Sequence, residues 1–175
     1  MVHGCAMARK SFPLPKVYGL LEPGPVVMVT TTCDGHPNSM TMSWHTMMEC
    51  EPPLVGCIIS DRNHSFGMLK ATNECVCVIN IPAVEIAEKV AGCGNTSGAT
   101  MDKFKAFDLT PKPAAQVGAP LIEECFANLE CQVVDTSMVD RYCLFVLEVI
   151  TAWIAPAVKN PQTIHHPWLQ VTGSG

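Results

Sequence analysis

The dipeptide Asp34-Gly35 stands between two runs that suit β-strands, and this arrangement constrains the fold more than any other feature of the chain. Residues 26–32 are rich in β-branched side chains, which favour strands. Residues 38–47 follow the dipeptide and carry polar and apolar side chains in turn. Asp-Gly readily adopts the positive φ angles of a two-residue hairpin turn. The sequence therefore predicts a β-hairpin in which residues 26–32 pair with residues 38–47.

The predicted return strand has two chemically different faces, because successive side chains of a strand point to opposite sides. One face would carry Thr41, Ser43 and His45, and the other Met40, Met42 and Trp44. A strand of this kind can hold the polar part of a ligand on one face and cover a hydrophobic core with the other.

The rest of the chain predicts a single, mainly β domain that spans residues 1–175. Further strand-like segments are expected at residues 54–60, 74–81, 120–125, 127–135 and 142–155, and short helices from the loop 61–65 through Ala71, at 83–91 and at 102–106. The last strand is long and apolar, so we expect it to bend or to cross between sheets. Residues 1–16 are expected to form an extended arm. This order favours a β-barrel or sandwich with helices at its ends and lacks the strand–helix alternation of a Rossmann fold.

Composition excludes several classes of partner. Hydrophobic residues make up 48% of the chain and charged residues 15%, which predicts a large core and an apolar surface buried in an oligomer. The net charge is −5 and no basic run is present, so nucleic acid is not an expected partner. No apolar run is long enough to span a bilayer and the first ten residues have no signal core, so we expect neither a membrane association nor export.

The 10 cysteines contain no Cys-x-x-Cys pair. Most lie in apolar, strand-like runs and are interpreted as small buried hydrophobic residues in a reducing compartment, the cytoplasm. Cys75 and Cys77 with His165 and His166 lack the second ligand pair of a metal site, so no metal is expected. Cys93 lies in an irregular, exposed-looking segment; a reactive thiol there would need an adjacent base, and a free cysteine at a helix end is the simpler interpretation.

Two loops are candidates for ligand binding. Residues 92–98 contain three glycines, but their spacing and their position after a helix do not fit a dinucleotide loop. A backbone approach to a planar ligand and a plain helix-ending turn both remain open for this segment. The loop 61–65 puts Arg62 and Ser65 beside an expected helix N-terminus, which can form either an anion site or a solvated, capped turn. The hydroxyls of Thr41 and Ser43 favour the first alternative, a phosphate site.

Seven motifs in a fixed order resemble the flavin reductase-like FMN-binding family, and in particular its flavoredoxin branch. The resemblance covers roughly residues 14–166. The motifs are Pro-Gly-Pro-Val-Val-Met-Val-Thr-Thr (23–31), Asn-Ser-Met-Thr-Met-Ser-Trp (38–44), Pro-Pro-Leu-Val-Gly-Cys (52–57), Arg-Asn-His-Ser-Phe (62–66), Val-Ile-Asn-Ile-Pro (78–82), Cys-Gly-Asn-Thr-Ser-Gly with Asp-Lys-Phe (93–98 and 102–104), and Ala-Pro-Leu-Ile-Glu-Glu-Cys-Phe-Ala-Asn-Leu-Glu-Cys (119–131).

This resemblance implies a Greek-key split β-barrel that acts as a homodimer, with FMN near the subunit interface. It implies electron transfer from NAD(P)H through FMN to a small-molecule or protein acceptor, with the chemistry on FMN and no catalytic side chain. The alternatives are an FMN-binding electron carrier that a partner protein reduces, and a flavin-storage protein without turnover.

The implied FMN contacts follow the family motifs. Thr41 and Ser43, with the backbone around Met40, would hold the phosphate and ribityl chain, and Arg62 with His64 or Ser65 would neutralise the phosphate. Asn80 and the backbone at Ile81 would meet the edge of the flavin ring, and Ser97, Gly98 and Lys103 would close over the ring or its tail. The implied set of FMN-binding residues also includes Asn38, Trp44 and Ser60. Where the family continues with a glycine-rich aromatic segment, residues 167–175 read Pro-Trp-Leu-Gln-Val-Thr-Gly-Ser-Gly, so we expect one wall of the site to be altered.

Overall fold

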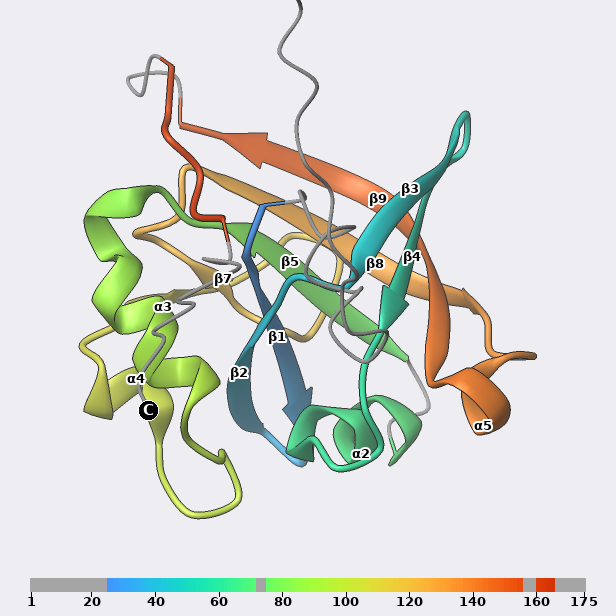
Figure 1. Cartoon of the computed structure of the whole chain (residues 1–175), viewed down its shortest axis with the longest axis horizontal. Helices are drawn as coiled ribbons and strands as arrows, with labels where there is room; N and C mark the ends of the chain where they lie inside the picture. Colours follow the sequence, from blue (N-terminus) through green and yellow to red (C-terminus); the bar gives the residue numbers. More distant parts are fainter. Residues whose placement is uncertain (1–24, 72–74, 156–159, 166–175) are drawn as a thin grey trace, which may run out of the picture.

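A seven-stranded antiparallel sheet forms the framework of the protein (Figure 1). The computed structural model describes residues 25–71, 75–155 and 160–165. The sheet has the order β2-β1-β5-β8-β9-β4-β3. Its strands are β1 (Val27–Cys33), β2 (His36–Met42), β3 (His45–Cys50), β4 (Pro53–Ile58), β5 (Val76–Ile81), β8 (Ala127–Asp135) and β9 (Leu144–Ile154). The sheet curls around a core without closing, so the predicted mainly β, split-barrel fold is confirmed.

The predicted hairpin is present between β1 and β2. Thr31 pairs with Asn38 and Val29 with Met40, and the turn places Asp34 at φ 50° and Gly35 at φ 75°. These positive φ angles are the reason why Asp-Gly suits this turn.

The return strand ends earlier than predicted. β2 stops at Met42, and β3 pairs with β4 instead of β1. Ser43 and Trp44 separate the two strands and carry the chain from one edge of the sheet to the other. The single strand predicted for residues 38–47 was therefore wrong, and His45 does not share a face with Thr41. The alternation of polar and apolar residues runs unbroken through this corner, so it contains no signal for the change of partner.

Both faces of β1 are buried, against two separate clusters. Val27 and Val29 face the barrel interior, where Met40 and Met42 also pack. Met28 faces a second cluster, which Val26, Val90, Cys93, Phe104, Leu109, Ile122 and Cys125 complete. The two methionines of β2 thus cover a core as predicted, while α3 (Ala87–Gly94) and α4 (Lys103–Ala106) cover the other face of the hairpin.

The helices are short and lie at the ends and edges of the barrel (Figure 1). α2 (His64–Ala71), α3 (Ala87–Gly94) and α4 (Lys103–Ala106) were predicted. The 3₁₀ turn η2 (Val84–Ile86) precedes α3, and Asp102 caps α4 by accepting a hydrogen bond from the Lys105 amide at 3.2 Å. No helix in the described ranges is both long and apolar enough to cross a bilayer.

The C-terminal half contains features that the sequence pattern did not indicate. The expected strand 120–125 is reduced to β7 (Leu121–Ile122), which pairs with β6 (Pro111–Lys112) in a separate two-stranded sheet. α5 (Val139–Tyr142) directly precedes β9 and takes the first residue of the expected strand 142–155, and Cys143, at φ 56°, ends this helix. β9 pairs with β8 on one side and with β4 on the other, and its pairing with β8 contains two register shifts. The predicted arm 1–16 and the atypical tail 167–175 lie outside the described residues.

All nine described cysteines are free thiols. Five of them are buried, namely Cys57, Cys77, Cys93, Cys125 and Cys131. Burial raises the pKa of the Cys57 and Cys125 thiols to about 12. Cys93, expected in an exposed segment, is fully buried in the last turn of α3, and its burial raises its pKa as well. These thiols are therefore core residues, as the composition argument predicted for most of them.

Candidate functional site

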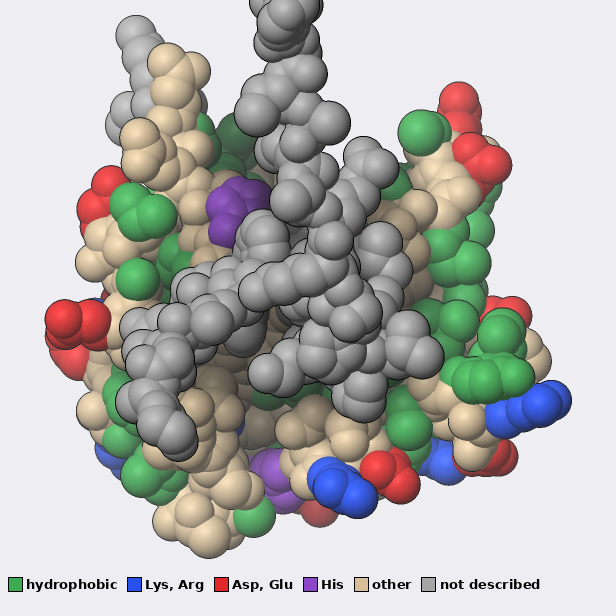
Figure 2. Space-filling model, viewed as in Figure 1, with side chains coloured by type: hydrophobic (Ala, Val, Ile, Leu, Met, Phe, Trp, Pro, Cys, Tyr) green, Lys and Arg blue, Asp and Glu red, His purple; other side chains and the backbone are tan. Residues whose placement is uncertain are grey.

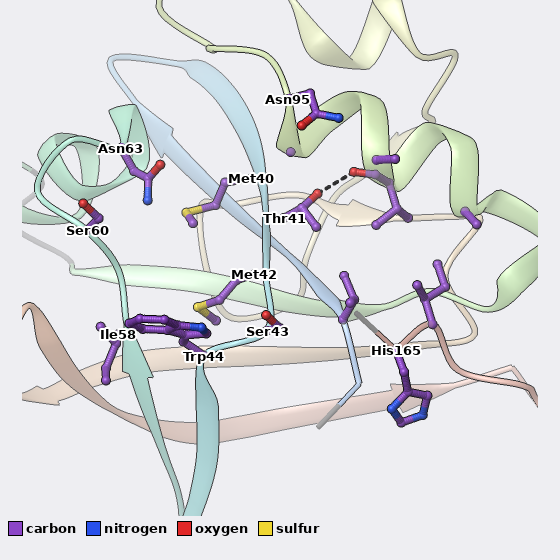
Figure 3. A pocket seen from close by; sticks show the side chains of 16 residues that line it. Met40, Thr41, Met42, Ser43, Trp44, Ile58, Ser60, Asn63, Asn95 and His165 are labelled. Carbon is purple, nitrogen blue, oxygen red and sulfur yellow. Dashed lines mark hydrogen bonds between the residues drawn. The ribbon is translucent and has the colours of Figure 1, made fainter. Parts of the chain in front are cut away.

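A pocket of about 690 Å³ lies where β2 meets the ends of α3 and β4 (Figure 3). This size is usual for a small-molecule or cofactor site. The lining residues are Val26, Met40, Thr41, Met42, Ser43, Trp44, Ile58, Ser60, Asn63, Ala87, Val90, Ala91, Gly94, Asn95, Ile164 and His165.

The second half of β2 forms the floor of the pocket. Met40 and Met42 contribute sulfur and methylene groups, and the Thr41 hydroxyl donates a hydrogen bond of 2.7 Å to the Val90 carbonyl of α3. A Cβ at Gly94 would lie only 3.2 Å from Cβ of Thr41. Glycine at this position therefore allows the end of α3 to approach β2 closely and to form one wall of the pocket.

One end of the pocket carries neutral polar groups and lies next to the start of α2. Ser60 and Asn63 lie in the loop between β4 and α2, and Asn95 faces them from the end of α3 (Figure 3). The Asn63 carbonyl accepts a 3.0 Å bond from the Phe66 amide, so Asn63 stands at the start of α2. The first N–H groups of a helix have no partner within the helix and attract anions. This end of the pocket can therefore bind a phosphate group without a lining cation.

The opposite end is apolar except for one imidazole. The Val26 amide donates a 2.6 Å bond to the Ile164 carbonyl, and Pro25 forms an isolated β-bridge with His165. Val26 and Ile164 contribute hydrophobic surface there, and His165 lines this end as well, across the pocket from Ser60 and Asn63 (Figure 3). Among the described lining residues, His165 is the one ionisable side chain.

The predicted site residues fall into three groups. The first group lines the pocket: Met40, Thr41, Ser43, Trp44 and Ser60. The second group lines a smaller cavity of about 350 Å³ between the hairpin turn and α2: Asn38, His64 and Gly98. Asn38 donates a 2.8 Å bond to the Ser65 hydroxyl, and a Cβ at Gly98 would collide with the Asn38 amide. Ser65 itself is buried.

The third group lines neither of these two cavities. Asn80 is fully buried, and its amide bonds to Met28, Thr30, Val78, Ile122 and Asn128. The NH₂ group and the oxygen of this amide are both hydrogen-bonded inside the sheet, so the side chain stabilises the fold. Ile81 pairs with Ala127 in β5, and the Ser97 hydroxyl accepts a local bond from the Ala99 amide.

Lys103 is also placed differently from the expectation. It is buried, and its ammonium donates bonds of 2.8 Å to the carbonyls of Ser39 and Cys93. Burial lowers the pKa of this ammonium, while the nearby Cys93 acts in the opposite direction. The lysine therefore joins β2 to the C-terminal turn of α3 behind the pocket wall.

Arg62 is exposed in the loop before α2, and its backbone amide donates to the Ser60 hydroxyl at 3.3 Å. In the described part of the chain its guanidinium has no ion-pair partner. It does not line the pocket, but it lies between Ser60 and Asn63 in the chain, and both of these do.

Sequence reasoning missed part of the pocket. Asn63, in the loop 61–65, was not assigned to the site. The contributions of α3 and of residues 164–165 were missed as well. Their local sequence gives no signal, because Ile164 and His165 reach the pocket only through backbone pairing with Pro25 and Val26.

This chain is similar in sequence to a known protein family and to several proteins of archaea. Residues 20–168 match the model of a family described as flavin reductase like domain. An uncharacterized protein of Archaeoglobus fulgidus is 32% identical over 124 residues, which are 71% of this chain and 69% of the relative. An uncharacterized protein of Pyrococcus abyssi is 32% identical over 133 residues, 76% of this chain and 75% of the relative.

Solved structures share the fold. The FMN-binding domain of a flavin reductases-like enzyme from Shewanella baltica superimposes with a TM-score of 0.73 at 25% identity, covering 86% of this chain and 79% of the other. Flavoredoxin of Desulfovibrio vulgaris gives 0.75 at 21% identity, with 90% and 82% covered. An NADH:FAD oxidoreductase from Streptomyces globisporus gives 0.73 at 24% identity, with 87% and 91% covered.

Proposed function

This chain belongs to the flavin reductase-like family, and from that premise we propose that it binds FMN in the pocket beside β2 and passes electrons from NAD(P)H through this FMN to an acceptor. The observation that carries the proposal is the two-ended character of the pocket. A helix N-terminus with Ser60, Asn63 and Asn95 lies at one end, and apolar surface lies at the other. FMN has the same polarity, with a phosphate at one end and a planar ring at the other.

The lining residues fit this cofactor chemically. Asn63, Asn95 and the first N–H groups of α2 would bind the phosphate, with Arg62 as the nearby cation. The hydroxyls of Thr41 and Ser43 would meet the ribityl chain. Met42, Trp44, Ile58 and the Val26–Ile164 pair would cover the ring and exclude water from it.

When bound, FMN supplies the hydride chemistry, so the protein needs to bind, orient and shield it. A pocket that only binds and shields FMN needs no charged side chain, and the lining of this pocket agrees with that. The side chains of the described lining include no Lys, Arg, Asp or Glu. NAD(P)H as the co-substrate is part of the same proposal.

We also propose that the protein acts as a homodimer. β3 is an edge strand on which Met47 and Met48 are 61% and 51% exposed. Figure 2 shows hydrophobic side chains gathered along the β3–β4 hairpin. Trp44, 49% exposed at the pocket, leads directly into this strand, so a partner seated on β3 would stand next to the site. A cytoplasmic location is proposed because free thiols persist in reducing compartments.

Two titrations test the proposal. Purified protein is titrated with FMN while the quenching of flavin fluorescence is followed, and then NADH and NADPH are added separately without oxygen. The proposal expects saturable 1:1 binding and bleaching of the flavin absorption by one or both nucleotides. Binding without bleaching, restored by a partner reductase, would favour the electron-carrier alternative, and the absence of FMN binding would contradict both.

A dimer is tested by sedimentation of the wild type and of Met48→Glu. The wild type is expected to sediment as a dimer and the variant as a monomer, because a carboxylate on an apolar interface is costly to desolvate. A wild type that sediments as a monomer at all concentrations would contradict the dimer.

A further inference from the structure

His165 is the one ionisable side chain among the described residues that line the pocket, and neither the family resemblance nor the fold assigns it a role. All other lining side chains are apolar or are neutral hydroxyls and amides. Such groups bind a ligand and cannot move a proton near neutral pH. An imidazole can do so, and it is the most frequent general acid or base in proteins.

The backbone holds this imidazole in place. Residues 162–165 lie across the end of the pocket through four backbone contacts. The Val26 amide bonds to the Ile164 carbonyl at 2.6 Å and the Val84 amide to the Gln162 carbonyl at 2.9 Å. The two remaining contacts are the β-bridges Pro25–His165 and Ala83–Thr163.

The side chain of His165 is fixed as well. Its Nε2 lies 3.0 Å from Oγ1 of Thr163, two residues earlier. A threonine hydroxyl can donate to or accept from a ring nitrogen, so this bond can persist in both protonation states of the imidazole. Thr163 thereby holds the ring of this pocket-lining residue in either state.

The position of His165 in the pocket would bring it close to the flavin ring, the part of the cofactor that reacts. It lies at the end of the pocket away from the α2 N-terminus (Figure 3). If the phosphate of FMN is bound at that N-terminus, the ring end of FMN lies on the side of His165. This step rests on the proposed function.

We propose that His165 donates a proton to a small, uncharged organic acceptor that is reduced inside the pocket. The acceptor receives a hydride from the reduced cofactor and a proton from the imidazolium of His165. The cofactor is oxidised by two electrons, the acceptor gains two electrons and two hydrogens, and the imidazole recovers its proton from water.

The remaining lining defines the class of acceptor. Trp44 and Ile58 present apolar surface at the pocket, and no Lys or Arg of the described lining could bind a carboxylate or phosphate on a second ligand. A conjugated carbonyl compound or a quinone fits these walls. A one-electron protein carrier would not need a proton donor in the pocket.

His165→Gln tests the role, and His45→Gln is its matched control. His45 also lies against the segment at Pro25, whose carbonyl is 2.8 Å from its Nε2, but it does not line the pocket. FMN-loaded proteins are reduced with NADH or dithionite, and reoxidation is followed with two probes. A cyclic enone requires a hydride and a proton, whereas ferricyanide takes single electrons and no proton.

We expect His165→Gln to lower the reoxidation rate with the enone by about 100-fold or more, and to change the rate with ferricyanide by less than about 3-fold. His45→Gln should leave both rates within about 3-fold of the wild type. Thr163→Val, which keeps the imidazole but removes its orienting hydroxyl, should lower the enone rate by about 10-fold. In an NMR titration of the apoprotein with FMN, the ring signals of His165 should shift and those of His45 should not.

Equal losses with both probes, or none with the enone, would overturn the proposal. A wild type that binds FMN and reduces ferricyanide but not the enone would also overturn it and would leave the proposed function intact. Failure to bind FMN contradicts the proposed function separately. If His165→Gln does not fold, Thr163→Val and the NMR titration still decide the question.

Discussion

The pocket and the interior of the sheet both contain asparagines, and they differ in what these amides bind. Asn80 and Asn128 are buried in the sheet, and the Asn80 amide bonds to five partners from β1, β5, β7 and β8. Asn63 and Asn95 lie at the pocket with exposed side chains. The residue type is the same, but the first pair is committed to the fold and the second remains accessible to a ligand.

The same contrast holds for charged groups. The Glu130 carboxylate is fully buried and accepts hydrogen bonds from the Ala115 amide at 2.9 Å, the Gln116 amide at 2.6 Å and the Trp153 indole at 2.7 Å. Arg62, by contrast, is exposed and has no ion-pair partner in the described ranges. Polar side chains whose hydrogen bonds are made within the fold are structural, whereas polar side chains that stay accessible are candidates for ligand binding. Neither the residue type nor its position on a strand makes this distinction.

Substituting one asparagine from each region gives the strongest test of this contrast. Asn80→Ala leaves the Ile122 amide and the Asn128 amide without their shared acceptor, so the free energy of unfolding should fall by about 4 kcal/mol. Asn95→Ala should cost less than about 0.5 kcal/mol, because its side chain is exposed, yet it should weaken FMN binding. Urea denaturation and FMN titration of both variants check this. Similar stability losses in both variants would remove the distinction.

Glu130→Gln tests whether the buried carboxylate stabilises the segment that it binds. Losing the charge should lower the free energy of unfolding by about 3 kcal/mol at pH 7, because a glutamine amide has one acceptor oxygen, so at least one of the three N–H donors would lose its acceptor and face an NH₂ group. Glu130→Asp, which keeps the charge but shortens the reach, is the control that separates charge from geometry.

The pH dependence of this effect has a defined sign. Burial alone would raise the pKa of Glu130, but the hydrogen bonds from Ala115, Trp153 and Gln116 outweigh it and hold the pKa below its ordinary value. The stabilisation is therefore fully present above the pKa of an unfolded glutamate and is lost as the pH falls toward the lower folded pKa. The difference between wild type and Glu130→Gln should shrink from pH 7 to acid pH, and a difference that grows would contradict this account.

Arg62→Ala addresses the exposed charge. Removing a cation beside the phosphate end of the pocket should raise the Kd for FMN about 10-fold, equal to about 1.4 kcal/mol. The free energy of unfolding should change by less than about 0.5 kcal/mol. Arg141→Ala is the matched control, since Arg141 stacks on the Tyr142 ring at 5.1 Å and does not line the pocket. Unchanged FMN affinity in Arg62→Ala would exclude the proposed role of this guanidinium.

Thr41 stands between the two regions, because it lines the pocket and also bonds to α3. Thr41→Val keeps the shape but removes the 2.7 Å bond to the Val90 carbonyl, so the free energy of unfolding should fall by about 1 kcal/mol. Thr41→Ser retains the hydroxyl and should lose less. If Thr41→Val weakens FMN binding without any loss of stability, the hydroxyl serves the ligand and not the fold.

A mainly β barrel or sandwich and its first hairpin could be predicted because their signals are local, whereas the split barrel followed from the family resemblance. The Asp34-Gly35 turn sets the register of β1 and β2, and the alternation in β2 assigns Met40 and Met42 to the core. The corner at Ser43–Trp44 could not be predicted, since the same alternation continues through it.

The roles of Asn80 and Lys103 depend on partners that are remote in the sequence. Asn80 is satisfied by Ile122 and Asn128, more than forty residues away, and Lys103 by Ser39. His165 reaches the pocket through pairing with Pro25 at the other end of the described chain. A single sequence shows that such residues are polar, but it does not show whether they are hydrogen-bonded inside the fold.

The most direct test of the central claim is an FMN titration of the purified protein compared with Asn63→Ala and Asn80→Ala under native conditions. We predict saturable 1:1 binding by the wild type, clearly weaker binding by Asn63→Ala, and wild-type affinity in the folded fraction of Asn80→Ala. A wild type that does not bind FMN, or a loss of affinity that follows Asn80 and not Asn63, would contradict the assignment of the pocket beside β2.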